Sequence, residues 1–131
     1  MKRSTREKLR LVLFEFLRFA NEQKLNTNDI VLYQCLAMAD GAASLRGLAL
    51  ASALPVETAR RSLGRLAAKG LVERTEAGIR LTEAGRRLGD EIYLLLWDRL
   101  EGRLRSLCAD LGEEADSDAG PGSSGPVERT R

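Results

Sequence analysis

The stretch from Ser44 to Gly85 constrains the fold of this chain more than any other part of it. A capping serine followed by an apolar pattern predicts a short helix, and a proline after a tight turn predicts a longer helix over residues 55–69. Gly70 ends that helix, and two short runs, 71–74 and 79–82, predict a β-hairpin. Few folds accommodate this order of short helix, turn, longer helix and hairpin.

Helical periodicity continues on both sides of this stretch and predicts helices over residues 4–23, 29–39 and 83–111. Aromatic residues make up only 5% of the chain, and Leu and Ala supply most of its apolar residues, which favours helices over an all-β fold. The expected fold class is therefore mainly α with a small β-hairpin. We expect one domain, residues 1–111.

The first and last helices carry wider apolar faces than a protein of this size can cover alone. Leu11 and Phe14 widen the apolar stripe of the first helix, and Trp97 lies outside the leucine stripe of the last. A second subunit is the expected cover, so the sequence predicts a homodimer formed by helices within residues 1–24 and 83–111.

The last twenty residues, 112–131, differ from the rest in composition. They are rich in Gly, Ser, Pro and acidic residues, and Val127 is their only large aliphatic side chain. Such a segment buries too little apolar area to offset the entropy of ordering, so we expect a disordered acidic tail.

Positive charge is concentrated in two parts of the chain. The stretch from Ser44 to Leu81 has seven cations and three anions, a net charge of +4, although the whole chain carries only +2. The first ten residues carry another +4. This distribution is typical of proteins that contact nucleic-acid phosphates.

The predicted helix at 55–69 turns its apolar residues to one side and its charged residues to the other. Arginine can bind guanine O6 and N7 in a bidentate manner, and Thr and Lys can bind phosphates. An ordinary solvated helix with arginines for solubility is the alternative. The candidate DNA-binding residues are Arg46, Glu57, Thr58, Arg60, Arg61, Arg65, Lys69, Arg74 and Arg80. Among them, Arg60, Arg61 and Arg65 are the candidates for base as well as phosphate contacts.

Several motifs of the stretch resemble a winged helix-turn-helix. They are Leu48-Ala49, the run from Leu54 to Leu63, Leu66, Gly70-Leu71-Val72-Glu73-Arg74, and Arg80-Leu81-Thr82-Glu83-Ala84-Gly85. The series is similar to bacterial transcriptional regulators of the MarR type and to their ArsR and PadR relatives. The resemblance implies that residues 55–69 are the recognition helix, that 71–82 form a short wing, and that the flanking helices form the dimer interface. Ala53 departs from the pattern, because a turn glycine is common at this position.

The sequence offers no pattern for enzymatic chemistry, and we expect neither an enzyme nor a cofactor. The chain has no histidine, no nucleophile set beside a base and no glycine-rich phosphate loop. Cys35 and Cys108 are far apart in sequence, so no disulfide scaffold or metal site is expected, and Cys35 is either an inert buried thiol or a redox sensor. Tyr33, Tyr93 and Trp97 either belong to the core or the dimer interface, or line a pocket for a small-molecule effector.

No apolar stretch is long enough to span a bilayer, and no secretion signal is evident, so we expect a cytoplasmic protein without a membrane partner. The sequence thus predicts a transcriptional regulator that binds double-stranded DNA as a homodimer. Two alternatives remain open at this point. One is a winged helix that binds another protein in a transcription or chromosome complex, and the other is a helical adaptor that only dimerises.

Overall fold

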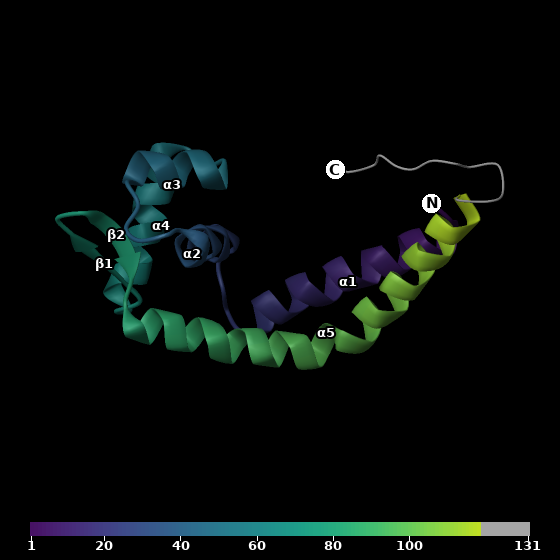
Figure 1. Cartoon of the computed structure of the whole chain (residues 1–131). Helices are drawn as coiled ribbons and strands as arrows, with labels where there is room; N and C mark the ends of the chain where they lie inside the picture. The colour runs from purple at the N-terminus through teal and green to yellow at the C-terminus, as the bar shows by residue number, and fades with distance from the viewer. Residues whose placement is uncertain (119–131) are drawn as a thin grey trace. The chain divides into compact units, whose positions relative to one another are not determined.

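The computed structural model describes residues 1–118 of the 131-residue chain. Within them, five helices and one antiparallel hairpin follow in the order predicted from the sequence (Figure 1). The elements are α1 (Arg3–Glu22), α2 (Thr27–Met38), α3 (Leu45–Ser52), α4 (Val56–Ala68), β1 (Val72–Thr75), β2 (Gly78–Leu81) and α5 (Glu83–Asp118). The predicted fold class, mainly α with a small β-hairpin, is confirmed.

Helix ends differ from the prediction by one or two residues where a cap sets them. The side chain of Asn26 accepts a hydrogen bond from the backbone N–H of Asn28 at 2.9 Å, so α2 begins at Thr27, two residues before the predicted Asp29. Pro55 keeps an extended backbone as the N-cap, and α4 begins one residue later than predicted.

The hairpin pairs β1 with β2 in a register that places Glu73 opposite Arg80. The hydroxyl of Thr75 donates to the carbonyl of Gly78 at 3.0 Å and closes the turn. Gly78 has a φ of +135°, and a Cβ there would lie 2.7 Å from the carbonyl oxygen of Ala43, so the turn requires glycine.

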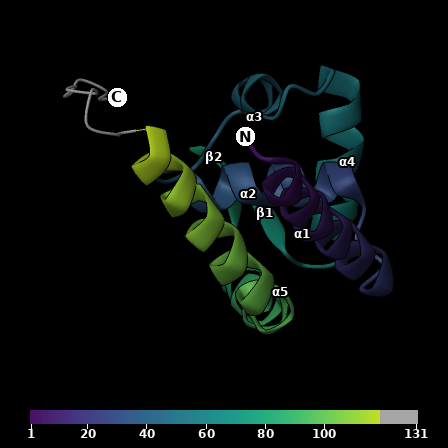
Figure 2. The same cartoon turned by 90° about the vertical axis from the view of Figure 1, so that its right-hand side faces the viewer.

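The described residues form two compact units, which we treat separately. The winged unit, Phe19–Leu95, contains α2, α3, α4 and the hairpin. Its three helices pack on one another, and α2 and α4 also pack on the hairpin (Figures 1 and 2). Their buried core consists of Leu32, Leu36, Leu48, Ala49, Ala59, Leu63, Leu66, Val72, Ile79 and Leu81.

Among the described residues, the helical unit combines Met1–Arg18 with residues 96–118. Polar contacts between α1 and α5 show that the two helices run antiparallel here. The ammonium of Lys8 lies 2.9 Å from the carboxylate of Asp110, and the buried hydroxyl of Thr5 donates to the carboxylate of Glu114. Toward the other end of α1, Arg103 donates to Glu15 at 3.3 Å.

These contacts explain why α5 extends beyond the predicted end of the helix. The sequence placed the start of a disordered tail at residue 112, but α5 continues to Asp118. The composition of the segment does not indicate this longer helix, because the carboxylate of Glu114 accepts from Thr5 on α1, far away in sequence. The rest of the predicted tail, residues 119–131, lies outside the described residues.

Two further observations concern the described part of the chain. None of its helices is long and apolar enough to cross a membrane. Cys35, half-buried, and Cys108, exposed, are both free thiols.

Candidate nucleic-acid interface

Helices α3 and α4 form a helix-turn-helix whose geometry follows from local backbone chemistry. The hydroxyl of Ser44 accepts the backbone N–H of Gly47 at 3.0 Å and caps α3. Ala53 ends α3 in the left-handed region, with a φ of +60°, and so takes the conformation that the missing turn glycine would supply. The backbone N–H of Leu54 then donates to the carbonyl of Ala49 at 3.0 Å.

One side of α4 is buried and the other faces solvent, as its periodicity predicts. Ala59, Ser62, Leu63 and Leu66 are buried in the winged unit. The exposed side carries most of the candidate DNA-binding residues of this helix. They are Glu57, Arg60, Arg61, Arg65 and Lys69, whereas Thr58 is half-buried.

Arg65 has a structural partner that the sequence did not predict. Its guanidinium donates to the carboxylate of Asp29 on α2, with donor–acceptor distances of 2.8 and 3.4 Å. The hydroxyl of Ser62 donates to the same carboxylate, and both Asp29 and Ser62 are buried. The hydrogen bond to Asp29 raises the pKa of Arg65. Arg65 therefore connects α4 to α2 through its Nε and one terminal nitrogen.

The other two arginines of α4 differ from each other. The Nε of Arg60 donates to the carboxylate of Glu57 at 2.9 Å, an ion pair three residues apart on the helix surface. Arg61 has no ion-pair partner within residues 1–118, and the same holds for Lys69 at the end of α4. The spacing of Glu57 and Arg60 was a sequence signal for their pairing, but the two residues were predicted only as separate DNA contacts.

The hairpin places one paired and one unpaired arginine beside this helix in the same unit. Arg80 on β2 donates through its Nε to the carboxylate of Glu73 on β1 at 2.7 Å. Arg74 is exposed and has no ion-pair partner in the described part of the chain. Arg46, exposed on α3, is likewise unpaired there.

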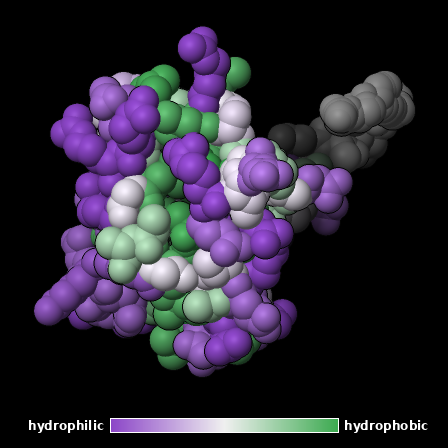
Figure 3. Space-filling model, turned by 90° about the vertical axis from the view of Figure 1, so that its left-hand side faces the viewer, coloured by the Kyte–Doolittle hydropathy of each residue, from purple (hydrophilic) through white to green (hydrophobic). Residues whose placement is uncertain are grey.

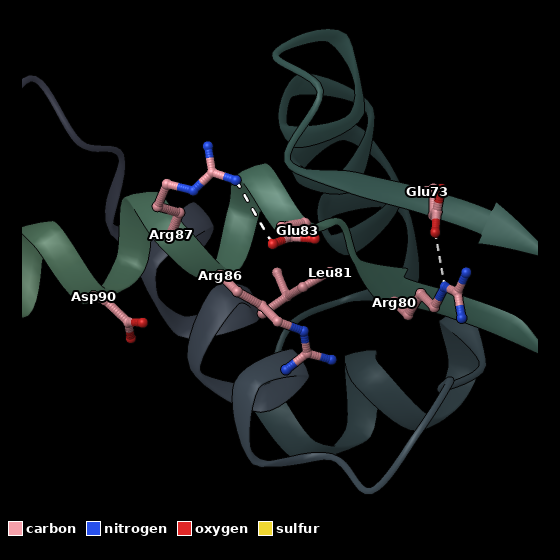
Figure 4. Close-up of a pocket in the computed structure, with 7 residues that line it drawn as sticks. All are labelled: Glu73, Arg80, Leu81, Glu83, Arg86, Arg87 and Asp90. Atoms are coloured by element: carbon pink, nitrogen blue, oxygen red, sulfur yellow. Dashed lines mark hydrogen bonds and ion pairs between the residues drawn. The ribbon is translucent and has the colours of Figure 1, made fainter.

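A groove runs along the base of the hairpin and the first turns of α5 (Figure 4). Its charges largely cancel, because Arg80 pairs with Glu73 and Arg87 lies 3.7 Å from Glu83. The remaining lining residues are Leu81, Arg86 and Asp90. Figure 3 shows the side of the molecule that carries the hairpin, where hydrophilic residues dominate and a band of hydrophobic residues runs between them.

Tyr33 does not line that groove. Its hydroxyl lies against Gly89 of α5, so closely that a Cβ at this glycine would overlap with it. Burial is the main cause that raises the pKa of Tyr33, and the nearby charge of Asp90 adds to the effect. Tyr33 thus packs against the first part of α5 within the winged unit.

Solved structures share this architecture at low sequence identity. Ligand-free NadR is 21% identical, with 85% of this chain and 92% of NadR covered and a TM-score of 0.60. CouR from Rhodococcus jostii RHA1 is 22% identical, with 90% and 88% covered and a TM-score of 0.57. BpsR from Bordetella bronchiseptica is 23% identical, with 95% and 82% covered and a TM-score of 0.52.

These three structures share the winged helix-turn-helix fold. The chain has the winged helix-turn-helix fold. Neither the models of protein families nor the curated proteins give a match. The likeness thus confirms the fold that the sequence motifs indicated, in which the hairpin follows the helix-turn-helix of α3 and α4.

Proposed function

We propose that this protein is a transcriptional regulator that binds specific sites on double-stranded DNA as a homodimer. The proposal is based on a set of exposed cations in the winged unit that have no ion-pair partner. Arg46, Arg61, Lys69 and Arg74 belong to this set within the described residues. Cations that are not neutralised by the protein are available to phosphates, whose contacts dominate the affinity of DNA-binding proteins.

The proposal gives the candidate residues different roles. Arg61 lies at the middle of the exposed side of α4, on the same side as Gly64, and is placed to reach base edges in the major groove. Lys69, Arg46 and Thr58 contact the DNA backbone, and Arg74 and Arg80 do so from the wing. Arg65 is reassigned from a base contact to the support of α4, because its guanidinium is bound to Asp29.

The homodimer rests on the exposed apolar side chains of α1. Leu13, Phe14 and Leu17 are each more than half exposed, which is unusual for adjacent large hydrophobic residues on one helix. A second copy would cover them and would carry a second α4. Two such helices would enter successive major grooves of a pseudo-palindromic site, about 34 Å apart.

A small-molecule effector is part of the proposal, and its chemistry is suggested by the structural neighbours. NadR has been solved in complex with 4-hydroxyphenylacetate, CouR with p-coumaroyl-CoA, and the DNA binding of BpsR is regulated by 6-hydroxynicotinic acid. Aromatic acids and their thioesters are therefore the first compounds to test, by their effect on the melting temperature and on DNA binding. A regulator of this kind works in the cytoplasm, where it has access to DNA.

The test is a selection from a randomised duplex library with the full-length protein, followed by titrations of the enriched duplex at several salt concentrations. We expect one enriched, pseudo-palindromic sequence and an affinity that falls steeply with salt. Arg74→Ala should weaken enriched and scrambled duplexes about equally and reduce the salt slope by about one. A protein that enriches no sequence and binds duplexes without salt dependence would instead support the alternative, a winged helix that binds another protein.

A further inference from the structure

The surface of α4 holds a carboxylate where DNA binding alone would disfavour one. Glu57 lies in the first turn of the proposed recognition helix, and its side chain is 66% exposed. A carboxylate that faces DNA is repelled by the phosphates, so it lowers the affinity for every sequence. The role of this carboxylate is therefore sought in the neighbouring side chain to which it is hydrogen-bonded.

That neighbour is Arg60, which is bound through its Nε and not through its terminal nitrogens. The carboxylate of Glu57 accepts from the Nε of Arg60 at 2.9 Å, and no ion pair joins it to Arg61 within the described residues. The guanidinium is planar and rigid, so a bond at Nε fixes its plane while the two terminal nitrogens remain available. Those nitrogens form the fork that matches O6 and N7 of guanine.

We propose that Glu57 is a specificity-determining residue, which orients Arg60 to read a guanine while Arg61 remains free. This inference rests on the proposed function and adds to it the base that one residue recognises. The bond is expected to strengthen when the interface excludes water, since a charge-assisted hydrogen bond gains at lower dielectric. The carboxylate thus exchanges general affinity for discrimination between bases.

The wing supplies a matched control within the same unit. Glu73 holds the Nε of Arg80 in the same way, at 2.7 Å, but on the hairpin rather than on the recognition helix. Removing either carboxylate takes one negative charge from the winged unit and breaks one exposed ion pair. Only the removal of Glu57 should change the base preference within the major-groove part of the site.

The experiment uses the full-length protein and the duplex enriched from the randomised library. Each guanine of the enriched site is replaced in turn by 7-deazaguanine, which lacks the N7 acceptor, and Kd is measured by fluorescence anisotropy. The wild type should lose about tenfold affinity at one guanine per half-site, as expected for the loss of a good bidentate contact. Glu57→Ala and Arg60→Ala should each reduce this ratio to about threefold or less, and the double variant should lose no more than Arg60→Ala alone.

Two further readouts separate this role from a general effect of charge. Glu57→Ala and Glu73→Ala should both bind a scrambled duplex more tightly than the wild type, because each removes a repulsive carboxylate, while Glu73→Ala keeps the wild-type ratio at guanine. Glu57→Gln, which keeps a neutral acceptor for Nε, should have an intermediate ratio.

The inference is overturned if the wild type enriches a site but Glu57→Ala or Arg60→Ala keeps the full discrimination at every guanine. It is also overturned if Glu57→Ala instead loses preference for a cytosine, since Glu57 would then accept directly from cytosine N4. A wild type that enriches no site fails at an earlier step and overturns the proposed function itself. Both side chains are more than half exposed, so these variants should fold, which their melting temperatures will verify.

Discussion

Asp29 is a buried carboxylate whose hydrogen bonds go to the helix proposed to face DNA. It accepts from Ser62 and from Arg65, so its two oxygens hold two successive turns of α4. Burying a carboxylate is costly unless its hydrogen-bonding capacity is satisfied, and these partners satisfy it. A single residue of α2 thereby fixes how α4 is rotated and which of its side chains point outward.

This arrangement predicts that two arginines of α4 differ in their contribution to the free energy of unfolding. Arg65→Ala should lower the free energy of unfolding, because the buried carboxylate of Asp29 then keeps Ser62 as its side-chain donor but loses its cationic partner. Arg61→Ala, the matched control without an ion-pair partner in residues 1–118, should stay within about 0.5 kcal/mol of the wild type. Urea unfolding gives both values.

For duplex binding we expect the reverse, a larger loss of affinity in Arg61→Ala than in Arg65→Ala. Arg61→Ala should weaken binding to the enriched site by about 1–3 kcal/mol if Arg61 reads a base. The assignment of Arg65 to a structural role is wrong if Arg65→Ala leaves stability unchanged and abolishes recognition of the site.

Substitution by alanine should change stability in opposite directions at two glycines. A Cβ at Gly64 on α4 would meet no atom within 4 Å, so Gly64→Ala should stabilise the protein by about 0.5–1 kcal/mol through the higher helix propensity of alanine. A Cβ at Gly85 would lie 2.2 Å from the carbonyl oxygen of Leu71, so Gly85→Ala should destabilise it by about 1–3 kcal/mol. Thermal unfolding of both variants checks these signs.

Gly64→Ala also tests how closely α4 approaches DNA. We expect weaker duplex binding together with the higher melting temperature, because the added methyl group would stand between the helix and a base edge or a phosphate. Unchanged affinity for the enriched site would mean that DNA does not approach the helix at Gly64.

At the scale of elements, the antiparallel pair of α1 and α5 in the helical unit is held by polar contacts at several levels. Thr5 and Lys8 reach the carboxylates of α5 at one end, and Glu15 accepts from Arg103 further along. Hydrogen bonds from the hydroxyl of Thr5 and from the backbone N–H of Lys2 lower the pKa of Glu114. The acidic end of α5 is thus tied to the start of α1 by a contact that depends on pH.

The sign of this dependence follows from linkage. A carboxyl whose pKa is lowered by folding contributes stability above its unfolded pKa, which is near 4.3 for glutamate, and loses this contribution as the pH falls through the lower folded value. The wild type should therefore lose more stability on acidification below about pH 5 than Glu114→Gln does. Glu113→Gln, which removes the same charge at the exposed neighbouring position, is the matched control for Glu114→Gln.

Urea unfolding at several pH values, followed by fluorescence of the single tryptophan, Trp97, reports on this unit. Parallel profiles for the wild type and Glu114→Gln would show that the bond from Thr5 to Glu114 does not contribute to stability.

At the scale of the whole molecule, local signals in the sequence predicted nearly all of the winged helix. Ser44, Gly70 and Thr82 marked the boundaries of elements, and each makes the cap or turn expected of it. Ser44 accepts the N–H of Gly47, Gly70 takes a φ of +76°, and Thr82 accepts the N–H of Gly85 at 3.0 Å. Such signals act over a few residues, so the order of residues suffices to find them.

The features that escaped prediction depend on residues far apart in sequence. Asp29 was predicted only as the first residue of a helix, because nothing near it in the chain indicates Ser62 or Arg65 as partners. The last turns of α5 were assigned to a disordered tail, because Thr5 stabilises Glu114 from the opposite end of the chain. The candidate site was predicted as a set of residues, whereas their division into paired and unpaired arginines required the three-dimensional structure.

The homodimer is the remaining prediction at this scale, and α1 offers a direct test of it. Phe16 and Leu96, on the first and last helices, are half-buried, whereas Phe14 is 56% exposed. Phe14→Asp should therefore leave the protomer folded while it places a charge in the proposed interface, where an unpaired buried charge is costly. Arg6→Asp is the matched control, because it adds the same side chain at an exposed polar position of the same helix.

Sedimentation equilibrium at micromolar concentration should give a dimer for the wild type and for Arg6→Asp, and a monomer for Phe14→Asp. The monomer should also bind the enriched duplex much more weakly, since only one α4 can then engage the pseudo-palindrome at a time. A folded wild-type monomer would exclude the dimer. A dimer that persists in Phe14→Asp would instead place the interface outside this face of α1, while the helix-turn-helix and its proposed DNA contacts would remain as assigned.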